Sequence, residues 1–150
     1  MRTLCDVLQR QHQRKLPHVL INVPPGMSKS LLTGVFLPAW SWGPGGEPGY
    51  RWGFASYDHR LVLRDSRKAK QLILSDFYQE RWPLKLLKDS TAQGEYTNEH
   101  NGYRVTATIR GGVTGRHVDT FVVDDPQKPL GLAKGSLTEE AKEAETARLW

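Results

Sequence analysis

Residues suited to binding phosphate lie near the start of the chain, where an apolar run ends in a Pro/Gly turn. The run Val19–Val23 is followed by Pro24-Pro25-Gly26, and Ser28-Lys29-Ser30 then opens a segment with helical spacing. A strand, a turn and a helix start in this order are typical of a phosphate-binding loop (P-loop). A lysine there reaches the β- and γ-phosphates of a nucleotide, and the serine after it binds Mg²⁺. The residues expected to hold ATP are Pro25, Gly26, Met27, Ser28, Lys29 and Ser30.

The loop departs from the common pattern G-x-x-x-x-G-K-[ST] at both of its glycines. Val23 stands at the first glycine position and Ser28 at the second, so Gly26 is the glycine left inside the loop. A serine with positive φ costs free energy that a glycine does not. The alternative interpretation of this segment alone is a buried strand that ends in an ordinary Pro-Pro-Gly turn.

Two adjacent carboxylates, far downstream, supply the second half of a nucleotide site. The segment Asp119–Pro126 is a short β-branched and aromatic run that ends in Asp124 and Asp125. A buried parallel strand has such a continuous apolar run, and α/β sheets bind ligands at the carboxyl ends of their strands. We expect Asp124, together with Ser30, to hold Mg²⁺, and Asp125 to orient or deprotonate the attacking water. The alternative without a function is an Asp-Asp-Pro turn after a strand.

The elements that would position these residues follow an α/β pattern. Further strands are expected at Val19–Val23 and Arg51–Tyr57, and a helix is expected from Lys29 to about Trp42, with Pro38 kinking or ending it. The pattern predicts a mostly parallel sheet of the P-loop NTPase type, flanked by helices, within one domain over residues 1–150.

Local signals predict the remaining elements. Asn101-Gly102 lies between alternating segments and indicates a β-hairpin. Ser136 and Glu139 form a capping box that would start a last helix. Asp58 can cap a long helix, and the apolar residues expected on its buried face are Val62, Ala69, Leu72, Ile73 and Phe77. An N-terminal helix is expected to use Leu4, Val7 and Leu8.

Composition restricts the class of protein. The chain has 150 residues and one cysteine, Cys5, which excludes a disulfide framework and a cysteine-rich zinc site. No apolar run has the length of a signal peptide core or a membrane span, so we expect a soluble intracellular protein. The first 75 residues carry 11 Lys and Arg against 4 Asp and Glu, a balance that suits phosphate or nucleic acid but is also common on a solvated surface.

Three further features are open to a functional or an ordinary interpretation. Arg116, after a Gly-rich turn, can act as a charge-stabilising finger or be an exposed arginine in a connector. Glutamines 9, 11 and 13 can bind the edge of adenine or remain solvated. A basic stripe on the long helix can contact DNA or face water, and it consists of Arg60, Arg64, Arg67, Lys68 and Lys70.

The order and spacing of several short motifs resemble one known family. The chain is similar to the ATPase domain of the large terminase subunit, the DNA-packaging motor of tailed bacteriophages, over about residues 18–130. The matching motifs are Asn22-Val-Pro-Pro-x-x-x-Lys-Ser30, Leu37-Pro-Ala-Trp40, Ala55-Ser-Tyr57, Leu63-Arg-Asp-Ser-Arg67, Asp76-Phe-Tyr-Gln79, Gly112-x-Thr-Gly-Arg116 and Val122-Val-Asp-Asp-Pro126.

The resemblance implies roles for the matching positions. Lys29 and Ser30 would hold phosphate and Mg²⁺, Asp124 would direct the metal, and Asp125 would be the catalytic carboxylate. Gly26 and Ser28 stand where the family often has arginine and glycine, which implies slow hydrolysis or an arginine from a neighbouring subunit. The family also implies a ring of copies, double-stranded DNA, a portal protein and a small terminase subunit as partners, and a location in the host-cell cytoplasm and transiently at the phage prohead.

The resemblance also implies that the chain is an N-terminal piece. The family's C-terminal nuclease domain and the strand and coupling motif after the acidic strand have no counterpart here, so the fold is expected to be incomplete at its C-terminus. Two other functions stay open: a non-catalytic remnant that binds DNA or a packaging partner, and a helicase-like P-loop ATPase.

Overall fold

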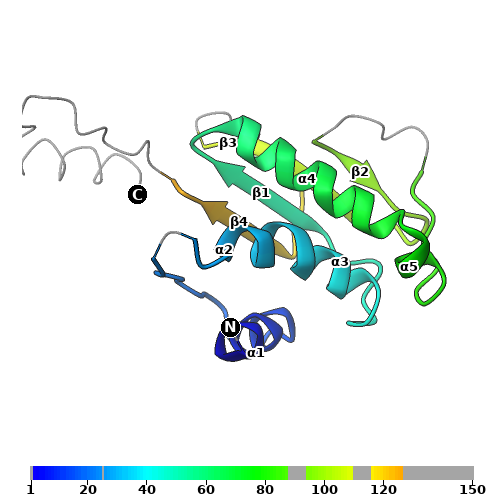
Figure 1. Cartoon of the computed structure of the whole chain (residues 1–150), viewed down its shortest axis with the longest axis horizontal. Coiled ribbons are helices and arrows are strands. Elements are labelled where there is room, and N and C mark those ends of the chain that lie inside the picture. The colour runs from blue at the N-terminus through cyan, green and yellow to red at the C-terminus, as the bar shows by residue number, and fades with distance from the viewer. Residues whose placement is uncertain (1, 25, 88–93, 110–115, 127–150) are drawn as a thin grey trace, which may run out of the picture.

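The computed structural model describes residues 2–24, 26–87, 94–109 and 116–126. The expected helix from Ser136, the turn at 111–115 and Pro25 lie outside these residues. Within these ranges the elements follow one another in this order (Figure 1): α1 Arg2–His12, α2 Lys29–Leu31, the π-helical turn η1 Leu32–Phe36, α3 Leu37–Trp42, β1 Trp52–Ser56, α4 His59–Ile73, α5 Asp76–Gln79, β2 Tyr96–Thr97, β3 Tyr103–Thr108 and β4 Thr120–Asp124.

The described strands form one mixed sheet with helices packed against it, which confirms the predicted α/β class. The strand order is β2-β3-β1-β4. β1 is parallel to both of its neighbours, with Phe54 opposite Thr106 of β3 and Val122 of β4, whereas β2 is antiparallel to β3. The helical run α2-η1-α3 and the helix α4 lie side by side over the sheet (Figure 1). Because β1 and β4 run in the same direction, their carboxyl ends share one edge of the sheet.

The prediction of a strand at Val19–Val23 is wrong. These residues have no strand pairing with any described part of the sheet. Leu20 is 95% exposed, while Ile21 packs against the core. The segment therefore buries only part of its apolar surface, and an apolar run becomes a strand only where another backbone pairs with it.

The helix that begins at Lys29 continues past Pro38 to Trp42. Instead of a break, the structure has a π-helical turn just before the proline, in which Leu37 N donates to Leu32 O five residues earlier. A proline inside a helix removes one N–H donor and crowds the carbonyl four residues before it, which here is Gly34 O. The wider π turn accommodates this proline without ending the helix.

The predicted cap and hairpin are confirmed. The Asp58 carboxylate accepts a hydrogen bond from Arg60 N at the start of α4, which buries Val62, Ala69 and Ile73. Phe77 does not belong to this helix, because α4 ends at Ile73 and Ser75 caps the short α5. Phe77 is exposed there, so its predicted place on the buried face is wrong.

The hairpin joins β2 to β3, with Thr97 opposite Tyr103. Asn101 has a φ of 63°, a conformation that asparagine tolerates in such turns. In the described residues, no helix is both long and apolar enough to cross a bilayer.

Candidate functional site

Lys29 and the two adjacent aspartates meet in one cluster. Lys29 Nζ lies 3.0 Å from Asp124 Oδ1 and 2.8 Å from Asp125 Oδ1, although Asp125 follows Lys29 by 96 residues. The lysine side chain is 27% exposed, Asp124 is 22% exposed and Asp125 is 59% exposed. The cluster is therefore half-buried, and an anion can reach it from the solvent.

The backbone on both sides of the cluster holds it in place. Gly26 and Ser28 have φ values of 85° and 57°, and Leu32 N donates to Ser28 O where the helix starts. At the other side, Asp125 has a φ of 46°, and its carbonyl accepts a hydrogen bond from Tyr57 N just after β1. Residues with left-handed backbone are uncommon outside glycine and are often found at functional sites.

Lys29 is the cation that balances this cluster. Desolvation lowers the pKa of Lys29, but the hydrogen bonds to Asp125 and Asp124 and the charges of the two carboxylates raise it more, so the net pKa is raised. The ammonium group is thus charged at all physiological pH values. An anion that approaches the cluster would meet a charged ammonium group.

The other predicted site residues divide into two groups. Gly26, Met27, Ser28 and Ser30 belong to the loop and first helical turn beside Lys29, whereas Pro25 lies outside the described residues. Arg116 is in a different place: it precedes β4, forms an ion pair with Glu95 and is not part of the Lys29 cluster. Arg116 lies before the start of β4 and Asp124 is its last residue, so the two are at opposite ends of the same strand.

The oxygen atoms near Lys29 are suited to one kind of metal. Within the described ranges, no three His, Cys, Asp or Glu residues are grouped as a metal site. Asp124, Asp125 and the Ser30 hydroxyl are hard oxygen ligands. Mg²⁺ uses one or two protein carboxylates and completes its coordination with phosphates and water. The residues therefore fit Mg²⁺ bound with a nucleotide better than a metal held by protein alone.

An apolar pocket lies between α1 and the helical run that starts at Lys29. Its volume is about 200 Å³, and Gln9 is its polar residue. Gln11 instead donates its amide to Thr120 Oγ1, 3.1 Å away, at the start of β4. Of the three glutamines singled out in the sequence, Gln9 thus lines this pocket, whereas Gln11 contacts β4. The lining residues are Cys5, Leu8, Gln9, Leu32, Phe36, Leu37 and Trp40.

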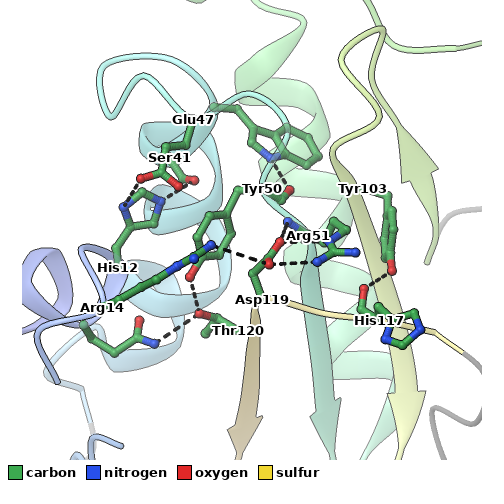
Figure 2. Close-up of polar contacts among 12 residues, drawn as sticks. His12, Arg14, Ser41, Glu47, Tyr50, Arg51, Tyr103, His117, Asp119 and Thr120 are labelled. Atoms are coloured by element: carbon green, nitrogen blue, oxygen red, sulfur yellow. Dashed lines mark hydrogen bonds and ion pairs between the residues drawn. The ribbon is translucent and has the colours of Figure 1, made fainter. Parts of the chain in front are cut away.

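A second polar cluster, at the amino end of β4, was not predicted from the sequence (Figure 2). Arg51 holds the Asp119 carboxylate with two side-chain hydrogen bonds of 2.9 Å, and its backbone N–H donates to the same group. The Arg51 hydrogen bonds lower the pKa of Asp119, with burial acting in the opposite sense. Tyr50 and Gln11 both hydrogen-bond Thr120 Oγ1, so α1 is fixed to this end of the strand.

His12 anchors the same helix in the core. Its Nε2 lies 2.7 Å from Ser41 Oγ, its ring stacks on Tyr50 with 4.5 Å between centroids, and both His12 and Ser41 are buried (Figure 2). Burial lowers the pKa of His12, although the Glu47 carboxylate opposes this effect. No spacing in the sequence links residues 12 and 41, so this contact depends on the tertiary fold.

The His12 contact predicts a pH-dependent stability. Because the folded pKa lies below the ordinary value of 6.5, the unfolded chain binds the proton more readily. The free energy of unfolding is therefore expected to fall as the pH drops below about 6.5. Urea denaturation at pH 7.5, 6.5 and 5.5 measures this dependence. His12→Gln, which keeps a hydrogen-bonding group without titration, should flatten it, whereas the same change at the exposed His18 should not.

The left-handed Ser28 predicts a stabilising substitution. Ser28→Gly relieves a backbone cost of about 1–2 kcal/mol but loses about 0.4–1 kcal/mol through the freer unfolded chain. The net gain is expected to be about 0.5–1 kcal/mol in the free energy of unfolding, measured by chemical denaturation. Ser28→Ala is the matched control, since alanine keeps the strain. Equal stabilities for the two variants would show that Ser28 is not strained.

Comparison of the chain with protein-family models, with curated proteins and with solved structures finds no match in any of the three.

Proposed function

We propose that this chain is the ATPase part of a phage DNA-packaging terminase large subunit, a P-loop enzyme that hydrolyses ATP to move double-stranded DNA. The observation that carries the proposal is the meeting of Lys29 with Asp124 and Asp125 at the carboxyl edge of the sheet. The lysine and the acidic pair come from the two motifs on which the resemblance depends. The cluster lies at the carboxyl end of a parallel strand, where open α/β sheets bind their ligands.

Each residue of the cluster has a role in this proposal. Lys29 leaves the carboxylates and binds the β- and γ-phosphates, as a P-loop lysine does. Asp124 and the Ser30 hydroxyl hold Mg²⁺, which neutralises charge on the phosphates. Asp125 orients a water molecule for in-line attack on the γ-phosphorus and accepts its proton, while the bond to the β-γ bridging oxygen breaks.

The pocket beside Gln9 supports ATP as the ligand. It adjoins the helix that carries Lys29, and a glutamine amide can donate to and accept from the edge of adenine. Trp40 and Phe36 offer apolar surface to a base. We assign the adenine ring to this pocket and the phosphates to the Lys29 cluster.

The position of Arg116 bears on how the enzyme is activated. Its ion pair with Glu95 keeps it away from the Lys29 cluster of its own chain. We propose that a charge-stabilising arginine comes from a neighbouring copy in a ring, and that turnover by a single copy is slow. The full protein would also meet the portal protein and the small terminase subunit, in the host-cell cytoplasm and at the prohead.

The basic stripe on α4 supports DNA as a partner, and also a second candidate function. Arg60 and Arg64 are paired with Asp58 and Asp65, and the adjacent Arg67 and Lys68 are exposed. A non-catalytic remnant that binds DNA would use the same stripe without hydrolysing ATP. The unusual loop, with Ser28 in place of glycine, favours this alternative.

Two measurements on the whole chain separate these functions. Titration with a fluorescent ATP analogue and Mg²⁺ tests binding, and single-turnover hydrolysis of ATP with and without double-stranded DNA tests catalysis. Saturable binding with turnover that DNA accelerates is the expected result. DNA binding without ATP binding would favour the remnant, and the absence of both would reject the proposal.

A further inference from the structure

A fully buried arginine lies beneath the helix that carries Lys29. Arg104, on β3, is 0% exposed. Its Nη1 donates to Gly34 O at 2.6 Å, and its guanidinium carbon lies 3.7 Å from the centre of the Phe54 ring. Its Nε and Nη2 have no hydrogen-bond partner among the described residues. The guanidinium thus lies between an aromatic ring of the sheet and one carbonyl of the helix.

Burial of this charge is costly. Desolvation lowers the pKa of Arg104, and only the nearby Tyr96 and Asp65 oppose the effect. Asp65 has its own ion pair with Arg64, at 2.9 Å, so Arg104 lacks a carboxylate of its own. An apolar side chain of similar size is often equal or better for stability at such a place. Stability alone therefore does not account for an arginine here.

The hydrogen bond from Arg104 Nη1 goes to the carbonyl whose usual helical donor, the N–H of residue 38, is replaced by a proline. In a regular helix Gly34 O would accept from the N–H of residue 38, but residue 38 is a proline. The π-helical turn Leu32–Phe36 surrounds this carbonyl. Arg104 supplies the donor that Pro38 removes, and it does so from the centre of the sheet.

The same turn holds Lys29 one helical turn earlier. Thr33 Oγ1 donates to Lys29 O at 3.1 Å, and Thr33 immediately precedes Gly34. Gly34 also lies close to α4, because a Cβ atom at this position would be 3.5 Å from Asp65 Cβ. The helix start is therefore held between β3 below and α4 beside it.

We propose that Arg104 is a positioning residue, which holds the π-helical turn on the sheet so that Lys29 is directed toward Asp124 and Asp125. The effect on catalysis rests on the proposed ATPase function, whereas the effect on Lys29 itself does not. Arg104 is fully buried, and its proposed effect on Lys29 passes through Gly34 O.

The test replaces Arg104 with methionine, which keeps length and apolar contact but has no donor. Arg104→Met is expected to lower kcat for ATP about 10²-fold, as a misplacement of about 1 Å in a catalytic group does, with a smaller change in KM. The melting temperature should change little. Arg81→Met is a closely matched control, since Arg81 also donates to a backbone carbonyl, Phe77 O at 2.9 Å, and lies over the Phe77 ring. It should keep parental kinetics.

Arg104→Lys is the conservative variant, because its ammonium group keeps a donor directed from β3 toward Gly34 O. It should retain most of the parental kcat. If Arg104→Met does not fold, a folded and active Arg104→Lys still supports the proposal. A folded Arg104→Lys that loses kcat as Arg104→Met does overturns it, as does failure of both variants to fold or a kinetic loss that only follows the fraction of unfolded protein.

A readout without ATP separates this inference from the proposed function. Acetylation of Lys29 by a succinimidyl ester, followed by mass spectrometry, reports how well its ammonium is held by the two carboxylates. Arg104→Met should speed this labelling severalfold, and Arg81→Met should not. If the parent protein neither binds nor hydrolyses ATP, the proposed function fails, and the labelling rate alone decides the role of Arg104. Equal labelling rates in the parent protein and in Arg104→Met would then overturn the positioning role.

Discussion

Lys29→Ala is expected to raise the dissociation constant for ATP about 10²-fold, and turnover should fall to background. The substitution removes the cation that would meet the phosphates and leaves two carboxylates that repel them. Truncation of one partner in such a charged group costs about 2–5 kcal/mol, and 2.7 kcal/mol corresponds to a hundredfold change in affinity. Equilibrium titration with a fluorescent ATP analogue at fixed Mg²⁺ and ionic strength measures the change.

The control for Lys29→Ala is the exposed Lys85, which lies before β2 and away from the cluster. Lys85→Ala should bind ATP as the parent does. Circular dichroism of both variants checks that the fold persists. Parental affinity in Lys29→Ala would remove the main support for a P-loop site, because the whole cluster depends on this lysine.

Asp125→Asn is expected to slow ATP hydrolysis without loss of ATP binding, whereas Lys29→Ala should lose both. Asparagine has the same shape and tolerates the left-handed backbone that Asp125 adopts, with a φ of 46°, so the fold should persist. It cannot accept a proton from water, and general base catalysis typically contributes 10²–10⁴-fold to the rate. We therefore expect single-turnover hydrolysis to fall by about 10²–10⁴-fold, while ATP binding is retained.

Quenched-flow measurement of phosphate release, at ATP concentrations that saturate both proteins, isolates the chemical step. Asp6→Asn, an exposed change on α1, is the control and should leave the rate unchanged. Full turnover in Asp125→Asn would show that Asp125 is not the base. A general loss of structure would not explain why Lys29→Ala loses ATP binding while Asp125→Asn keeps binding and loses hydrolysis.

The cluster could be predicted from the sequence because each half has a local signal. A helix start after a Pro/Gly turn places Lys29, and an apolar run that ends in two acids places Asp124 and Asp125. The strand expected before Lys29, at Val19–Val23, is absent, so the helix start alone places the lysine, whereas the acids lie at the carboxyl end of the parallel strand β4. The structure joins them at 2.8 and 3.0 Å. The sheet class, the Asp58 cap and the hairpin followed from equally local signals.

The wrong prediction of a strand at Val19–Val23 and the separation of Arg116 from the Lys29 cluster have different physical reasons. The apolar content of Val19–Val23 says nothing about whether another strand is available to pair with it. Arg116 was assigned by its charge and its Gly-rich surroundings, but a residue before β4 lies at the opposite end from Asp124. The direction of the strand, which the sequence does indicate, already argues against a finger role within the same chain.

Other site features depend on tertiary contacts that local patterns do not show. His12 meets Ser41, and Arg104 meets Gly34, across elements with no common motif. One signal for Arg104 was present, since a proline four residues after Gly34 predicts a carbonyl in need of a donor. The sequence could not show that an arginine 70 residues away would provide it.

The strand β4 has a consequence for the tolerance of the chain to insertions. At its amino end, Thr120 accepts a hydrogen bond from Gln11 of α1, and at its carboxyl end Asp124 forms an ion pair with Lys29. These ends are only about 13 Å apart, and a shift of one residue against β1 turns every side chain to the other side of the sheet. One extra residue before Thr120 would thus misplace Asp124 and Asp125 as well as Thr120. The length and register of β4 therefore fix the distance between the two clusters.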